Sequence, residues 1–120
     1  MPPKTTAIHT VQVPSKVAVK VDGAQLDVLR TLQRADFGAF QDASQSLVQC
    51  KSPQVVLDLS RCTYVNSLFI GMLVDAVTSL RNAGKVVTVR VSPQVGRFLQ
   101  MAHLYHIFEY TVTETPEDHA

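Results

Sequence analysis

The stretch Val55-Val-Leu-Asp-Leu-Ser60, followed by Arg61-Cys-Thr-Tyr-Val65 and then by Asn66-Ser67, decides the fold of this chain. Its first part is an almost unbroken run of β-branched and aliphatic residues in which Asp58 is the single charge. Such a run is typical of a parallel strand that is covered on both faces. The sequence therefore predicts a central strand over residues 54–60, a loop after it, and a helix over residues 68–83 that is capped by one of the last two residues quoted.

The period of the apolar residues changes after Ser67. Apolar side chains now recur every three or four residues, which places them on one face of a helix. Asn66 or Ser67 is the expected N-cap of this helix, and Gly84 is the expected stop at its C-terminus. Residues 86–91 are then predicted as the next strand, parallel to the first and joined to it by a right-handed crossover. The predicted core stripe of the helix is Phe69, Leu73, Ala76 and Leu80.

The beginning of the chain divides into a loose segment and a hairpin. Residues 1–15 carry several Pro and Thr residues and no period, so we expect a loose terminus with a candidate edge strand at residues 11–13. Two apolar runs flank Asp22-Gly23, which predicts antiparallel strands near residues 16–21 and 25–33. Because a type I′ turn needs a positive φ at both central positions, we expect one centred on this dipeptide.

The remaining elements follow from capping signals. Asp36 is expected to cap a first helix with Phe37 and Phe40 on its buried face, and Ser92-Pro93 predicts the start of a last helix. A last strand is predicted over residues 105–110. The order is two strands, helix, strand, helix, strand, helix, strand. This order predicts an α/β fold over residues 16–120, with a mixed sheet that is antiparallel at its first hairpin and parallel at the later crossovers. The predicted domain ends in a short acidic tail.

The central crossover resembles that of the STAS domain, the family that includes the bacterial anti-sigma-factor antagonists. The resemblance runs over roughly residues 16–110 and is carried by Leu57-Asp-Leu-Ser60, by Tyr64 to Leu73 and by Ser92-Pro93. The family's helix start has the text Asp-Ser-Ser-Gly-Leu-Gly, and Asn66 to Gly71 occupies these places. Asn66 stands where the family has Asp, Leu68 where it has the second Ser, and Phe69 where it has the first Gly.

This resemblance implies a function in regulation. It implies a non-enzymatic module that binds an anti-sigma factor, a serine kinase or another regulatory protein, with Ser67 as the phosphorylation candidate. A phosphate would add about −1.5 to −2 charges at the binding surface and so release the partner. Two alternatives stay open: Ser67 is only a helix cap, or the chain is a STAS scaffold or accessory subunit that binds its partner constitutively.

Apolar residues also widen the long helix beyond its core stripe. Ile70 and Val74 extend the apolar arc on one side, and Leu68 and Met72 extend it on the other. This is more apolar width than one sheet face usually covers, which predicts a docking surface. The alternative is that neighbouring helices cover both flanks. The candidate partner-binding residues are Asn66, Ser67, Leu68, Ile70 and Val74.

No set of residues in the sequence indicates catalysis, a metal or a cofactor. His103 and His106 are three residues apart, but no Cys, Asp or Glu cluster completes a metal site beside them. The five glycines are scattered and form no phosphate-binding loop. A formal net charge of +1 gives no electrostatic case for direct binding of nucleic acid. We therefore expect a protein that is not an enzyme and that has neither metal nor cofactor.

Composition also indicates where such a protein works. No run approaches the roughly 20 apolar residues of a membrane span, and residues 1–10 lack the apolar core of a signal peptide. We therefore expect a cytoplasmic protein without a membrane partner, present as a monomer or weak dimer. Cys50 and Cys62 are the two cysteines, and in that compartment they are expected to be free thiols packed as small apolar side chains.

Overall fold

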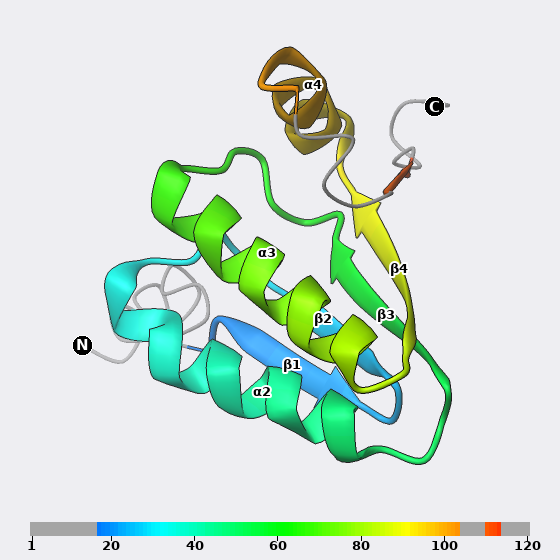
Figure 1. Cartoon of the computed structure of the whole chain (residues 1–120). Helices are drawn as coiled ribbons and strands as arrows, with labels where there is room; N and C mark the ends of the chain where they lie inside the picture. The colour runs from blue at the N-terminus through cyan, green and yellow to red at the C-terminus, as the bar shows by residue number, and fades with distance from the viewer. Residues whose placement is uncertain (1–16, 104–109, 114–120) are drawn as a thin grey trace, which may run out of the picture.

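The computed structural model describes residues 17–103 and 110–113 of the chain. The described residues form a five-stranded sheet with strands in chain order (Figure 1). The pair β1 and β2 is antiparallel, and every later pair is parallel, so the predicted mixed sheet is confirmed. The elements are β1 (Val19–Asp22), β2 (Gln25–Val28), a 3-10 turn η1 (Arg34–Asp36), α2 (Phe37–Gln49), β3 (Gln54–Leu59), α3 (Ser67–Asn82), β4 (Val86–Val91), α4 (Pro93–Met101) and β5 (Thr111–Val112).

The described α helices all pack on one face of the sheet. In Figure 1, α2 and α3 lie side by side across β1 to β4. Gly96 of α4 approaches the side chains of Val91 and Val112, which lie opposite one another on β4 and β5. Each crossover connection adds the next strand at the same edge of the sheet, so that the strands follow one another in chain order. Right-handed connections that all run in this direction place their helices on one face of the sheet.

The core lies between this face and the helices. Leu26, Leu57 and Val89 stand opposite one another on three adjacent strands, and all of them are buried. The other face carries Val56 and Asp58 of β3, which are only half-buried. The prediction that the central strand is covered on both faces is therefore wrong for the part of the chain that the structure describes.

The first hairpin turns one residue later than predicted. Asp22 still belongs to β1 and pairs with Gln25, so that Gly23 and Ala24 form the turn. Gly23 has a φ of 63°, and among the described non-glycine residues only His103 has a positive φ. A positive φ at the first central residue alone is the pattern of a type II′ turn, not of the predicted type I′ turn.

β2 ends at Val28, before the predicted residue 33, because the chain leaves the sheet near Arg30. The Arg30 guanidinium donates two hydrogen bonds to the Asp36 carboxylate, at 2.8 and 2.9 Å. The amide of Gln33 donates to the same carboxylate at 2.7 Å. These bonds, those from Arg30 above all, hold the pKa of Asp36 below its usual value. Asp36 occupies the N-cap position of α2 as predicted, but its side chain holds the preceding loop and does not cap the helix.

Asp36→Asn is expected to lower the free energy of unfolding near neutral pH by about 2 kcal/mol, the scale of hydrogen bonds to a charged group. Because folding lowers the pKa of Asp36, the stability that its charged carboxylate contributes is complete when the pH is above the unfolded pKa of about 3.9. It is lost as the pH falls through the folded pKa. Urea titrations of both proteins should differ near pH 7 and differ less near pH 3, which lies below the unfolded pKa of about 3.9. A difference that is the same at both pH values would contradict this account.

Of the other sequence predictions, some are confirmed, some are wrong, and some concern segments outside the described residues. β3, α3 and β4 are confirmed to within a residue or so, and the predicted core stripe of α3 is buried. Phe37, predicted to lie on the buried face of α2, is 44% exposed because it starts the helix beyond the edge of the core. The described last strand begins at Thr111, after Tyr110, and not before it. Residues 105–109, the candidate strand at 11–13 and the acidic tail from residue 114 lie outside the described residues.

Candidate functional site

The loop over residues 60–66 leads from the carboxyl end of β3 to the N-terminus of α3. Partners and ligands of parallel α/β sheets usually bind at this edge. Within the loop, Cys62 and Val65 are buried, whereas the Tyr64 side chain between them is 57% exposed. The loop therefore has its own anchors in the core and presents an aromatic ring to solvent.

Two hydroxyl groups from distant parts of the chain hold this loop. Ser92 donates to the carbonyl of Cys62 at 2.6 Å and also caps α4 by accepting from the amide of Val95. Thr31 donates to the carbonyl of Tyr64 at 2.7 Å. The start of α3 is thus fixed to the segment after β2 and to the end of β4. Sequence analysis missed the role of Thr31 and Ser92 at this site, because no local pattern links positions that are 33 and 30 residues apart.

Asn66, and not Ser67, is the N-cap of α3. Its side-chain oxygen accepts a hydrogen bond from the amide of Phe69 at 2.8 Å, and its carbonyl accepts from the amide of Ile70 at 3.0 Å. Ser67 is the first helical residue, and it is exposed. The alternative in which Ser67 serves only as the helix cap is therefore wrong, because Asn66 already fills that role.

The residues next to Ser67 face in different directions. Leu68 is 41% exposed, whereas Phe69 is buried in the core at 0% exposure. The phenyl ring at the place of the family's glycine therefore lies beneath the helix and leaves the solvent side of Ser67 open. Tyr64, Ser67 and Leu68 are exposed at this end of the helical layer, as are the polar loop residues Arg61 and Thr63.

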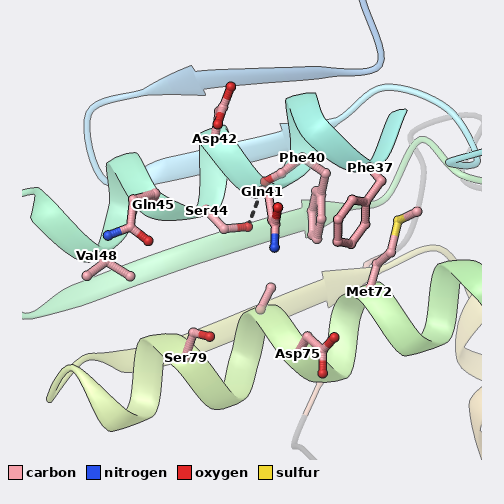
Figure 2. A pocket seen from close by; sticks show the side chains of 11 residues that line it. Phe37, Phe40, Gln41, Asp42, Ser44, Gln45, Val48, Met72, Asp75 and Ser79 are labelled. Carbon is pink, nitrogen blue, oxygen red and sulfur yellow. Dashed lines mark hydrogen bonds between the residues drawn. The ribbon is translucent and has the colours of Figure 1, made fainter. Parts of the chain in front are cut away.

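The two apolar flanks of α3 differ in how they are covered. Met72 is 4% exposed and lies against α2, where Figure 2 shows its side chain facing the rings of Phe37 and Phe40. Ile70 and Val74 on the other flank pack against the core but are only half-buried. The neighbouring helix α2 therefore covers Met72, whereas Ile70 and Val74 stay partly exposed. We use the term α3 surface for Tyr64, Ser67, Leu68, Ile70 and Val74.

The two cysteines are free thiols, as predicted. Burial raises the pKa of the Cys62 thiol to about 12, and the charge of Asp58 adds to the shift. A thiol in this state is protonated at neutral pH and a poor nucleophile. Cys62 therefore anchors the loop through packing and through its backbone carbonyl.

The described part of the chain holds no group of three or more His, Cys, Asp or Glu residues that could bind a metal ion. His103 is exposed just after α4, with a φ of 59°, and His106 lies outside the described residues. Among the described helices, none combines the length and the apolar character needed to cross a membrane.

Comparison with known proteins was made for the sequence and for the fold. A family model, STAS_2, described as "Mlab, STAS domain", matches residues 15–109. A search among curated proteins gave no match. An anti-sigma factor antagonist from Mycobacterium paratuberculosis is similar in structure, with a TM-score of 0.59, 19% identity, and coverage of 83% of this chain and 86% of that chain. A chain from the complex of the diguanylate cyclase SiaD with its activator SiaC, from Pseudomonas aeruginosa, has a TM-score of 0.61 and 18% identity, with coverage of 86% of this chain and 98% of that chain.

Proposed function

Because the chain belongs to the STAS domain family, whose model matches residues 15–109, we propose that it is a non-enzymatic regulatory module that binds an anti-sigma factor, a serine kinase or a related regulator. The family resemblance in the sequence is thereby confirmed. In this proposal the protein acts in the cytoplasm as a monomer or weak dimer. Its partner binds at the α3 surface, and phosphorylation of Ser67 releases it.

One observation carries the proposal: an exposed serine begins a rigidly held helix between two exposed hydrophobic side chains. Tyr64 and Leu68 are 57% and 41% exposed, at positions where the backbone is fixed by Thr31, Asn66 and the core. Large side chains on a rigid backbone are suited to act as binding anchors because little conformational entropy is lost when a partner covers them.

Ser67 is placed to act as a switch that does not disturb the fold. A phosphate on the first residue of a helix lies near the positive end of the helix dipole, so the helix should tolerate it. The same charge would lie beside Leu68 and Tyr64, where an apolar partner surface would have to desolvate it. Phosphorylation should therefore weaken binding without unfolding the domain.

The structural neighbours support a regulatory role in general terms. One is named an anti-sigma factor antagonist, and the other comes from a complex of an activator with a diguanylate cyclase. Both names describe proteins that act on other proteins. Their low identity to this chain leaves the partner itself to experiment.

A second candidate function is a STAS scaffold or accessory subunit that binds its partner constitutively. The exposed side chain of Leu68 favours it, because the family has a hydroxyl at this place and this chain has an apolar group. The two candidates share the α3 surface and differ only in whether Ser67 is modified.

A photo-crosslinking amino acid placed at position 64 or 68 tests the docking surface in the producing cell. We expect both positions to give the same crosslinked protein, identified by mass spectrometry as a regulator. Position 86 is the matched control, because Val86 is also a large exposed hydrophobic residue, at 61%, but lies on β4. A partner crosslinked only from position 86, or equally from all three positions, would contradict the proposed surface.

A further inference from the structure

A groove of about 250 Å³ runs between α2 and α3, on the side of these helices away from the sheet. Figure 2 shows it from close by, with α2 along one wall and α3 along the other. Its floor is mostly apolar: Phe40, Met72 and Ala76 line it and are 5% exposed or less, and Ser44 is the buried polar residue beside them. Phe37 lines the same end as Met72 and is 44% exposed. The groove therefore offers an apolar floor and one open aromatic ring.

The charged side chains that line this groove are all acidic. Asp42 and Asp75 line it, and its lining contains no Lys, Arg or His. Neither carboxylate forms an ion pair with a described residue. Because the whole chain has a formal net charge of +1, the negative charge is a local property of the groove. A basic occupant would satisfy it, whereas an acidic one would be repelled.

The walls also favour a helical occupant over an extended one. Both walls are helices, whose backbone groups are already paired along α2 and α3. The Ser44 hydroxyl in the groove donates to the carbonyl of Phe40 at 2.9 Å and so serves its own helix. An extended peptide would leave its own backbone groups unpaired over the apolar floor, whereas a helix pairs them internally.

We propose that this groove binds an amphipathic helix of a partner protein, which places an apolar side chain over Phe37 and Met72 and basic residues beside Asp42 and Asp75. The groove shares no lining residue with the α3 surface, although Leu68 lies one helical turn before Met72 on the same flank of α3. Met72 follows Ser67 by five residues, about 7–8 Å of helix rise. A phosphate on Ser67 is thus about one Debye length away at physiological salt. The groove can bind its helix whether or not the proposed switch is correct.

The test uses the whole chain and a synthetic helical peptide of about 18 residues, with Leu at helical spacing and Arg on both sides of the Leu stripe. We expect ¹⁵N chemical-shift changes confined to the groove. We also expect Asp75→Arg to weaken the peptide's affinity about tenfold, because it reverses a charge at the contact. The matched control Asp22→Arg, an exposed carboxylate on β1, should change the affinity less than twofold. A peptide with Glu in place of every Arg should not bind.

Any one of four results would overturn the proposal. They are equal effects of Asp75→Arg and Asp22→Arg on the affinity, binding of the peptide that carries Glu, chemical-shift changes on the sheet, and no binding of the peptide that carries Arg. Concentration-dependent self-association that Asp75→Arg abolishes would assign the groove to a second copy of this chain instead. Ser67→Asp should change the peptide's affinity less than about twofold. A large loss in that variant would mean that the groove and the switch are one site.

Discussion

Leu73→Ala is expected to lower the free energy of unfolding by about 2–5 kcal/mol. Leu73 is 0% exposed and belongs to the stripe through which α3 packs on the sheet. Removing its side chain loses the transfer free energy of the buried atoms and leaves a cavity that helix and strands cannot close without moving. Urea unfolding followed by circular dichroism would measure the change.

Ile70→Ala is the matched control for this prediction. It removes the same number of carbon atoms from the same helix, and the helix propensities of Leu and Ile differ by only about a few tenths of a kcal/mol. Ile70 is only half-buried, and its loss should therefore be less than half as large. Equal losses for the two variants would mean that Ile70 is a core residue, and the α3 surface would then lose one of its members.

Ser67→Asp is expected to weaken partner binding by about 100-fold, because it brings a charge into an apolar contact that cannot solvate it. The fold should stay intact, since Ser67 is exposed at the positive end of the α3 dipole. Binding to the partner recovered by crosslinking, measured by calorimetry, would test the first point, and the thermal midpoint would test the second.

Ser67→Ala is the control that separates the charge from the loss of the hydroxyl. It should keep binding within about twofold and stability within about 0.5 kcal/mol, because the helix is capped elsewhere. The cap loss of about 1 kcal/mol belongs to Asn66→Ala, whose side chain accepts from the amide of Phe69. A loss of binding in Ser67→Ala equal to that in Ser67→Asp would assign the effect to the hydroxyl and not to charge.

The sequence predicts most of the fold where the signal is local and periodic. β3, α3 and β4 follow from the switch between an apolar run and helical spacing, and the core stripe of α3 follows from the same pattern. The first hairpin was predicted with the wrong turn because Asp22-Gly23-Ala24 allows two turns one residue apart. Only the pairing of Asp22 with Gln25 decides between them.

Tertiary contacts decide what the sequence could not. The end of β2 depends on the bidentate contact of Arg30 with Asp36, and the open sheet face depends on all crossovers running in one direction. At the site, the motif predicts the position of Ser67 and Leu68 at the helix start. It cannot predict that α2 covers Met72, or that Thr31 and Ser92 hold the loop, since these residues meet only in the folded chain.

The most direct test of the central claim is the affinity of the partner for two forms of this protein, one unmodified and one with phosphoserine incorporated at position 67. The proposed switch predicts tight binding of the unmodified form, a loss of about 100-fold for the phosphorylated form, and the same circular dichroism spectrum for both. Equal affinity of the two forms would contradict the switch and leave the constitutive module as the function of this fold.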